Sequence, residues 1–289
     1  TAEALFRLNR ADSGAQLCAA LADWQAPMQN VVYADRAGEI GFLAAGRLPR
    51  RRAGNGWLPQ PGWNGEHDWT GFVPAAELPQ QTDPPGGRFI NANNRIVPQD
   101  FPVFVSRDWD APYRARRIAE RLAQVPRHTL ASTWAAQSDR VSLYARELLP
   151  LLLKTEPTDA LGRQALALLQ GRDGSIDRER PAPLILAAWL RELTRNLIAD
   201  ELGPDFRGQF QEHAELIRKA LDGTSRFCDD SVTTVTESCR ERVKTALATA
   251  LDGLAGEQGT NPSRWRWGRL HTAPFRRQRE WATRATAPI

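Results

Sequence analysis

The sequence predicts an α+β protein, because three stretches of the chain differ in composition. Residues 1–110 are rich in Gly, Pro and Trp and contain short apolar runs typical of strands. Residues 111–256 have the pattern of successive amphipathic helices, and residues 257–289 return to aromatic, strand-like sequence. A chain of 289 residues with 42% hydrophobic content can bury one large core or two smaller ones.

The first stretch predicts one helix and one hairpin. Residues 13–24 form an amphipathic pattern that must end before Pro27. Two apolar runs, 30–34 and 40–44, flank Asp35–Gly38, where Asp suits the start of a turn and Gly a positive φ. We therefore expect an antiparallel pair of strands here.

Residues 46–83 are rich in Pro and Gly and contain Trp57, Trp63 and Trp69. This composition favours an ordered loop that is pinned by buried indoles. The alternative is that the indoles are exposed and grip a ligand ring.

Helices dominate the second stretch. Asp110 is expected to cap a helix that begins near Ala111, with Pro112 in its first turn, where a missing N–H costs nothing. Its buried stripe would consist of Ile118, Leu122 and Val125. The clearest later helix has Val243, Leu247, Leu251 and Leu254 on one face, with Gly253 and Gly256 expected to break it.

Charge and cysteine content argue against several classes of protein. The net charge is +4, but the basic residues are scattered among 34 acidic ones, with only Arg50–Arg52 as a basic run, so we expect no nucleic-acid partner. No apolar stretch approaches the roughly 20 residues that span a bilayer. The three cysteines form no C-x-x-C pair, which argues against a zinc site.

The most informative segment is Asn91-Ala-Asn-Asn94, which follows two apolar residues. Asparagine is a poor strand former, so packing does not explain this cluster. An Asn amide donates hydrogen bonds without carrying a charge and can stabilise the oxyanion of acyl transfer. The alternative is that these side chains only satisfy the backbone of a turn.

Arg114 is the second candidate, because in the predicted helix it shares the apolar face with Ile118 and Leu122. An inward guanidinium must be hydrogen-bonded. Its partner is either a structural carboxylate or a group of an active site close to the Asn segment.

Other chemistry has less support. The four histidines have no nucleophile motif nearby, and neither G-x-S-x-G nor H-E-x-x-H is present. Asp100, Asp108 and Asp110 would either bind a hard cation or serve turns and caps.

Several segments in order resemble the penicillin acylase family of N-terminal-nucleophile hydrolases. Residues 29–41 resemble the family's hairpin, and residues 61–72 resemble the loop before its asparagine motif. Residues 91–94 match that motif, and residues 110–118 match the arginine-bearing helix after it. Residues 137–139 and 265–271 resemble later helical and strand segments of the family. Several motifs in one order are more specific than any single motif.

The resemblance implies roles for both candidates. In this family the precursor cleaves itself, and the new N-terminal residue attacks an amide with its own α-amino group as base. An asparagine side chain and a backbone N–H bind the oxyanion, and an arginine orients the site. Position in the motifs assigns these roles to Asn93 and Arg114. The chemistry needs no cofactor; a structural calcium ion occurs in some relatives, but its ligands are unknown in this sequence.

The resemblance also implies that the chain is an interior fragment of the large subunit. Residues 1–110 and 257–289 would belong to an αββα sandwich, and residues 111–256 to a helical insertion. Thr1-Ala-Glu-Ala does not resemble the nucleophile segment, so we expect Thr1 not to be the nucleophile. The small subunit and the remainder of the large subunit are the expected partners, and the expected location is periplasmic.

The function that this resemblance implies is hydrolysis of an N-acyl amide of the β-lactam or acyl-homoserine-lactone type. The alternatives are a non-catalytic binding or scaffold homologue that lost the nucleophile, and a carbohydrate-binding module that uses the Trp-rich loop. An intact self-cleavage junction upstream would favour the enzyme.

Cys228 and Cys239 are expected to form a disulfide, since they flank a short polar segment and the second opens a predicted helix. The resemblance to periplasmic enzymes favours this pairing. Cys18 is expected to remain a buried free thiol.

Overall fold

A computed structural model describes residues 1–206 and 213–273. The chain divides into two units, Thr1–Pro126 and Arg127–Ile289. Each unit has its own core, and we describe each by itself.

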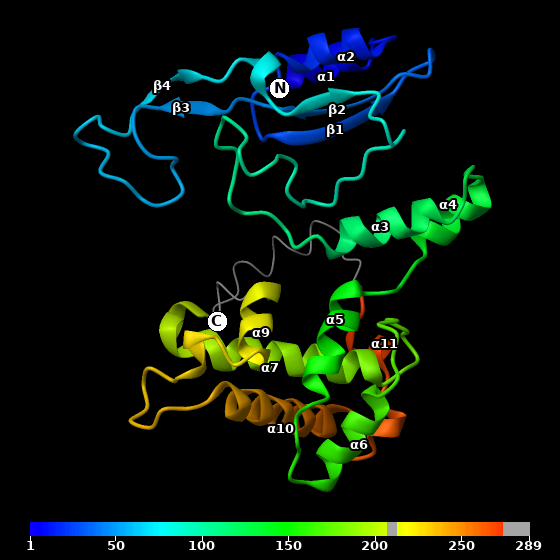
Figure 1. The fold of residues 1–289 in the computed structure, drawn as a ribbon, viewed down its shortest axis with the longest axis vertical. Helices are drawn as coiled ribbons and strands as arrows, with labels where there is room; N and C mark the ends of the chain where they lie inside the picture. The colour runs from blue at the N-terminus through cyan, green and yellow to red at the C-terminus, as the bar shows by residue number, and fades with distance from the viewer. Residues whose placement is uncertain (207–212, 274–289) are drawn as a thin grey trace, which may run out of the picture. The chain divides into compact units, whose positions relative to one another are not determined.

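The first unit is built on antiparallel strands (Figure 1). A sheet with the order β1-β2-β5 and a separate pair β3-β4 are formed. Their bounds are β1 Gln29–Ala34, β2 Ile40–Ala45, β3 Pro49–Arg51, β4 Trp69–Phe72 and β5 Gln80–Thr82. The predicted hairpin is confirmed, because β1 and β2 pair in antiparallel register with Ala34 opposite Ile40.

Asp35 organises the turn of this hairpin. Its Oδ1 accepts from the N–H of Ala37 at 2.8 Å and from that of Glu39 at 3.1 Å, and Gly38 has a φ of 90°. Desolvation acts to raise the pKa of Asp35, but the backbone donors, with Gly14 first among them, outweigh it and lower the pKa overall. The carboxylate is therefore matched to this turn in its ionised form.

Two short helices, α1 Ala2–Leu8 and α2 Gly14–Leu21, lie beside the β1-β2 hairpin (Figure 1). Ser13 caps α2, and the helix ends at Leu21, three residues short of the predicted end. A small core of Leu21, Leu43 and Ala45 joins α2 to the sheet, and the Cys18 thiol packs against its edge. Cys18 is free but only half-buried, so the prediction of a buried thiol is wrong.

The loop between Gly46 and Asp83 is pinned in a different way from the prediction. Trp57, Trp63 and Trp69 are 56%, 88% and 61% exposed, so they are not buried anchors. Aliphatic side chains anchor the loop instead: Leu48, Val73 and Leu78 form a cluster to which Met28, Val103 and Val105 add.

Arginines cover two of the exposed indoles. The guanidinium of Arg107 lies 5.0 Å from the ring centre of Trp57, and that of Arg51 lies 5.7 Å from the ring centre of Trp69. These contacts orient the rings on the surface of this chain.

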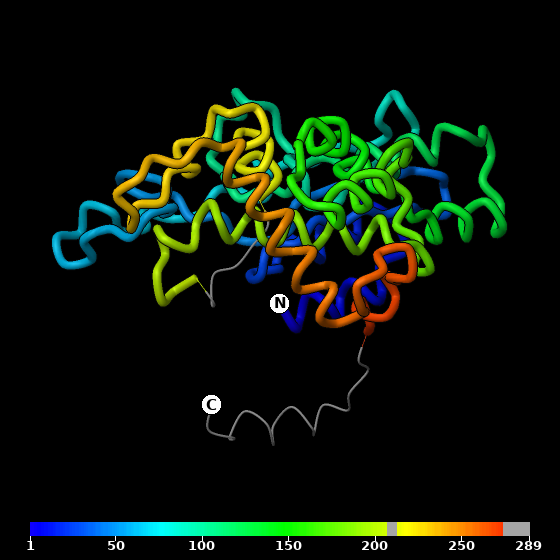
Figure 2. The backbone as a smooth tube through the Cα atoms, turned by 90° about the horizontal axis from the view of Figure 1, so that it is seen from below, coloured from blue at the N-terminus to red at the C-terminus, as the bar shows by residue number. Residues whose placement is uncertain are grey.

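The second unit is helical. Its helices are α4 Leu130–Gln137, α5 Leu143–Leu152, α6 Ala160–Leu169, α7 Ala182–Leu202, α9 Ala214–Leu221, α10 Cys239–Gln258 and α11 Trp267–Leu270. The central helix α7 is buried on most of its surface and packs against α10 (Figures 1 and 2). The buried indole of Trp189 on α7 donates to the carbonyl of Val243 on α10 at 2.9 Å. This bond satisfies a polar atom in an otherwise apolar interface.

Helix α10 confirms the predicted face, since Val243, Leu247, Leu251 and Leu254 are all buried. The predicted break at Gly253 and Gly256 is wrong, because the helix continues to Gln258 and ends at Gly259 with a φ of 86°. A glycine in a helix costs only about 1 kcal/mol, which packing of the apolar face offsets.

Residues 257–273 differ from the strand-like prediction. They complete α10 and then form a single 3₁₀ turn, Pro262–Arg264, and the short helix α11. The indole of Trp265 is fully buried and donates to the Gly259 carbonyl at 2.7 Å, so the aromatic content serves the helical core. The remaining part of this predicted region, 274–289, lies outside the described residues.

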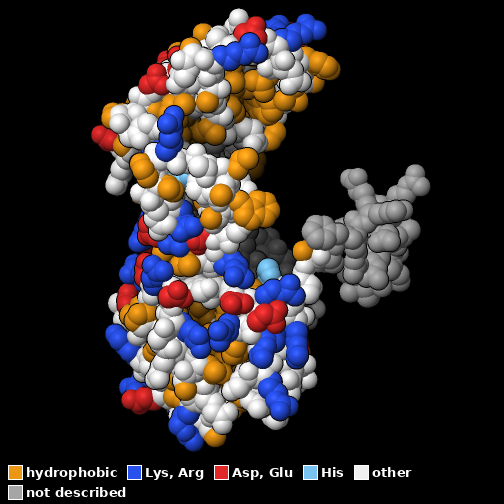
Figure 3. Space-filling model, turned by 90° about the vertical axis from the view of Figure 1, so that its right-hand side faces the viewer, with side chains coloured by type: hydrophobic (Ala, Val, Ile, Leu, Met, Phe, Trp, Pro, Cys, Tyr) orange, Lys and Arg blue, Asp and Glu red, His pale blue; other side chains and the backbone are white. Residues whose placement is uncertain are grey.

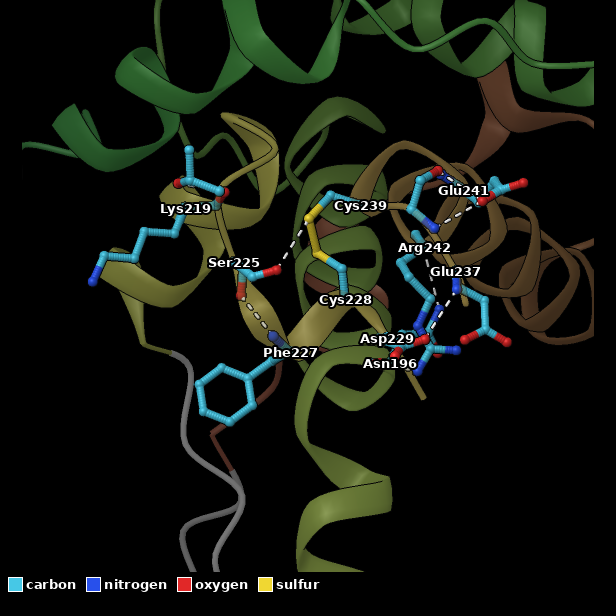
Figure 4. Close-up of a disulfide and its surroundings, with 12 residues drawn as sticks. Asn196, Lys219, Ser225, Phe227, Cys228, Asp229, Glu237, Cys239, Glu241 and Arg242 are labelled. Carbon is cyan, nitrogen blue, oxygen red and sulfur yellow. Dashed lines mark hydrogen bonds between the residues drawn. A yellow bond between two sulfur atoms is a disulfide. The ribbon is translucent and has the colours of Figure 1, made fainter. Parts of the chain in front are cut away.

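A disulfide joins Cys228 to Cys239 at the start of α10 (Figure 4). The carbonyl of Ser225 lies 3.5 Å from the Cys239 sulfur, and the polar segment between the cysteines is held by its own side chains. Glu237 accepts from the backbone N–H of Asp230 at 2.9 Å and from the hydroxyl of Thr233 at 3.0 Å. The loop is therefore closed covalently at its ends and by hydrogen bonds within.

Candidate functional site

The asparagine segment forms a tight turn in the first unit. Asn93 has a φ of 62°, in the left-handed region that asparagine tolerates better than most residues. The Oδ1 of Asn91 lies 3.4 Å from the Asn93 N–H, and the Oδ1 of Asn94 accepts from the Ala92 N–H at 3.1 Å. Two of the three asparagines therefore serve the turn backbone, as the alternative interpretation of this segment expected.

Asn91 also ties the turn to the sheet. Its Oδ1 lies 3.3 Å from the Nδ2 of Asn30 on β1, which is distant in the sequence. Its own Nδ2 is buried and has no acceptor within the described residues. The turn is thus held against β1 through a side chain and not through strand pairing.

Asn93 differs from its neighbours because its side chain does not serve the turn. The Oδ1 accepts from a terminal nitrogen of Arg114 at 2.8 Å. A guanidinium has only donors, so it fixes the polarity of the amide, with the oxygen toward Arg114 and the Nδ2 away from it. In the described part of the chain this exposed Nδ2 donates to no other group. Asn93 therefore presents an oriented, uncharged donor at the surface of this unit.

Arg114 lies in the first turn of α3 Tyr113–Ala123. The same terminal nitrogen that contacts Asn93 also donates to the Ala92 carbonyl at 2.8 Å and to the Asp110 carboxylate at 2.5 Å. Arg114 therefore contacts both a carboxylate and the candidate oxyanion donor.

The predicted burial of α3 is wrong. No side chain of the helix is buried, and Ile118, which was expected in the apolar stripe, is 40% exposed. The apolar face has no covering element within this unit, so periodicity alone identified a face without identifying its partner.

Asp110 was predicted as a helix cap, and this is also wrong. The cap position of α3 is Pro112, with no side-chain hydrogen bond to the helix. The Asp110 carboxylate instead bonds Arg114, and its backbone N–H donates to the Asn93 carbonyl at 3.0 Å. This role of Asp110 was not predicted from the sequence. The i, i+4 spacing of Asp110 and Arg114 was the signal that could have revealed it.

Metal and triad chemistry gain no support from the geometry. Within residues 1–206 and 213–273, no group of three or more His, Cys, Asp or Glu side chains is placed to hold a metal ion. The His67 ring bonds the Ala53 carbonyl, and His128 lies 3.4 Å from Ser132, whose hydroxyl belongs to the capping box of α4. The Thr1 hydroxyl donates to the Ala26 carbonyl at 2.9 Å.

Charged side chains of both signs are interspersed on the surface of the second unit (Figure 3). On the face drawn in Figure 3, the Lys and Arg side chains of the second unit lie among Asp and Glu side chains. In the first unit, the side chains of Asp110 and Arg114 are each 58% exposed, so this ion pair contributes about 0–1 kcal/mol to folding.

The model of the penicillin amidase family matches residues 1–288. The chain belongs to the penicillin amidase family. Its similarity to penicillin acylase 2 proenzyme of Pseudomonas sp. strain SE83 is 38% identity over 198 residues, which is 68% of this chain and 26% of that protein. The acyl-homoserine lactone acylase QuiP of Pseudomonas fluorescens is 31% identical over 299 residues, 94% of this chain and 36% of that protein.

A solved penicillin amidase relative has the same fold. The thermostable penicillin G acylase from Alcaligenes faecalis aligns with a TM-score of 0.67 and 21% identity, over 91% of this chain and 52% of that chain. The predicted α+β class and family fold are confirmed. The chain spans only part of the length of these relatives.

Among the helices of the described residues, none is both long and apolar enough to cross a bilayer.

Proposed function

We propose that this chain forms part of an enzyme that hydrolyses N-acyl amides, and that it supplies the oxyanion donor Asn93 and the orienting residue Arg114. The observation that supports this proposal is the 2.8 Å bond from Arg114 to the Asn93 Oδ1. It turns the Nδ2 of Asn93 outward as a fixed donor, which is the feature that an oxyanion site requires.

In the proposed reaction, a nucleophile from a segment outside this chain attacks the amide carbonyl. The carbonyl π electrons move onto oxygen, which becomes an oxyanion in the tetrahedral intermediate. The Nδ2 of Asn93 donates to this oxygen. The intermediate then collapses: the oxyanion electrons re-form the carbonyl, the C–N bond breaks, and the amine leaves with the proton that the nucleophile gave up on attack. Water then hydrolyses the acyl-enzyme and releases the acid.

Arg114 acts by position in this mechanism. Its charge is already matched by Asp110, and one of its terminal nitrogens contacts the Ala92 carbonyl, the Asn93 Oδ1 and the Asp110 carboxylate. Fixing the amide before the reaction begins avoids reorganisation when the oxyanion forms, which is the source of the rate gain at such sites.

We propose that the substrate is a secondary amide, an N-acylated amine. Relatives named penicillin acylase and acyl-homoserine lactone acylase both act, by their names, on N-acyl compounds. The amine product would be a β-lactam nucleus or a homoserine lactone. The attack and release steps need no cofactor, and a calcium ion would have a structural role.

A periplasmic location and processing from a precursor belong to the same proposal. The relative from Pseudomonas sp. is named a proenzyme. The Cys228–Cys239 disulfide favours an oxidising compartment. The remainder of the large subunit and a small subunit would complete the enzyme.

The test uses the complete protein with penicillin G and an N-acyl homoserine lactone as substrates. We expect turnover of at least one of them, and Asn93→Ala should lower kcat by roughly 100- to 1000-fold. Asn9→Ala is the matched control, because Asn9 is an exposed asparagine at the end of α1. Binding of either compound without turnover by the wild-type protein would instead support a non-catalytic homologue.

A further inference from the structure

We infer that Asp110 is a positioning residue for Asn93, an inference that rests on the function proposed above. Asp110 reaches Asn93 by two separate routes. Its carboxylate accepts from Arg114 at 2.5 Å, and its backbone N–H donates to the Asn93 carbonyl at 3.0 Å. The first route fixes the side chain of Asn93, and the second fixes its backbone.

The side-chain route depends on a crowded guanidinium. One terminal nitrogen of Arg114 serves the Ala92 carbonyl, the Asn93 Oδ1 and the Asp110 Oδ2. Two of these acceptors are neutral, and Asp110 supplies the charged one, which makes the stronger bond. Without the carboxylate, a guanidinium that is more than half exposed has other rotamers available in water. The Asn93 amide would then lose the donor that sets its polarity.

The backbone route holds a residue in an unfavourable conformation. Asn93 has a φ of 62°, and its own N–H lies 3.4 Å from the Asn91 Oδ1. The bond from the Asp110 N–H holds the opposite end of the residue. Hydrogen bonds at the N–H and at the carbonyl of Asn93 therefore fix its left-handed conformation, which limits the directions in which the Nδ2 can point.

A purely structural role does not explain this carboxylate. Asp110 does not cap α3, and the helix buries no side chain. The side chains of Asp110 and Arg114 are each 58% exposed, and exposed ion pairs contribute little to the free energy of folding. What the carboxylate does is to hold the group that orients Asn93.

The negative charge of Asp110, taken alone, would change the rate of turnover in the opposite direction from a positioning role. A carboxylate near a developing oxyanion opposes the reaction, so Asp110→Asn leaves the site more positive and would speed turnover if electrostatics governed it. A positioning role predicts slower turnover from the same substitution. The sign of the change therefore separates the two explanations.

The experiment measures kcat and KM in the complete protein for Asp110→Asn, Asn93→Ala and the double variant. We expect Asp110→Asn to lower kcat on the order of 10-fold with KM within about twofold of wild type. In the Asn93→Ala background it should have no further effect, because Asp110 acts through Asn93. Asp108→Asn is the matched control, since Asp108 is a neighbouring exposed acid and should retain wild-type kcat.

Each outcome decides one point. Wild-type kcat in Asp110→Asn, or losses that multiply in the double variant, would overturn the inference while the proposed function stands. Wild-type kcat in Asn93→Ala would overturn the proposed function and this inference with it. If Asp110→Asn does not fold, Asp110→Glu keeps the charge and moves it by one methylene, and the same dependence on Asn93 is required of it.

Discussion

Arg114 fixes the polarity of the Asn93 amide, because its all-donor guanidinium lies 2.8 Å from the Asn93 Oδ1. An amide that is free in solution presents its oxygen and its nitrogen equally well. Here the oxygen is occupied by Arg114, which leaves the Nδ2 as the group of this exposed side chain that is available to donate. This relationship distinguishes Asn93 from Asn91 and Asn94, whose oxygens accept from the turn backbone.

The first prediction concerns the chemical nature of this donor. Asn93→Asp keeps the size of the side chain and its bond to Arg114 but replaces the Nδ2 donor by a carboxylate oxygen. We expect kcat to fall by at least about 100-fold, with a melting temperature close to that of wild type. Enzyme kinetics and thermal unfolding of the complete protein measure the two effects. Activity within threefold of wild type would show that no donor is needed at this position.

The second prediction separates the geometry of Arg114 from its charge. Arg114→Lys keeps the positive charge, but its side chain is one atom shorter, which withdraws the terminal nitrogen that contacts Asn93, Ala92 and Asp110. We expect kcat to fall on the order of 10-fold while the melting temperature stays nearly unchanged. Arg116→Lys on the same helix is the control, because the Arg116 guanidinium lies 6.0 Å from the Tyr113 ring centre and contacts no part of the turn. A large loss of stability with normal kcat would make Arg114 a structural residue.

Local sequence signals predicted the elements whose partners are close in the chain. The β1-β2 hairpin follows from its turn residues and the two apolar runs that flank them, and α10 follows from its apolar spacing. Motif order then identified the fold family, which periodicity alone would not have done.

The errors arise where the partner of a face is distant or absent from this chain. The sequence predicted buried indoles at Trp57, Trp63 and Trp69, and a buried stripe on α3, because aromatic and periodic apolar residues are usually covered. Nothing in the local pattern specifies what covers them. The Asp110 role was missed for a related reason, since its bond to the Asn93 carbonyl depends on how the chain folds back between them.

The third prediction concerns the disulfide. Removing it by Cys228→Ser with Cys239→Ser should destabilise the second unit by about 3 kcal/mol, the chain-entropy cost of closing a loop of 11 residues. Thermal unfolding without reductant measures the loss, and peptide mapping should find wild-type Cys228 and Cys239 linked. Cys18→Ser is the control, because Cys18 is unpaired and lies in the other unit. Finding both cysteines of the pair as free thiols in periplasmically produced protein would contradict the assignment.

The last prediction concerns the loop that this disulfide closes. The pKa of Glu237 is held below its usual value of 4.5, first because the Asp230 N–H donates to the carboxylate, and further because Thr233 donates and Arg242 is nearby. A lowered folded-state pKa means that this group contributes its full stabilisation above about pH 4.5 and loses it as the pH falls through the lower, folded value. We therefore expect exchange of the Asp230 amide hydrogen, corrected for intrinsic rates, to speed up below pH 4.5 and to be independent of pH above it. Glu237→Gln removes the titrating group and should abolish this dependence, whereas Glu215→Gln, on α9, should leave it intact. Loss of protection at the same pH in Glu237→Gln would show that Glu237 does not control the loop.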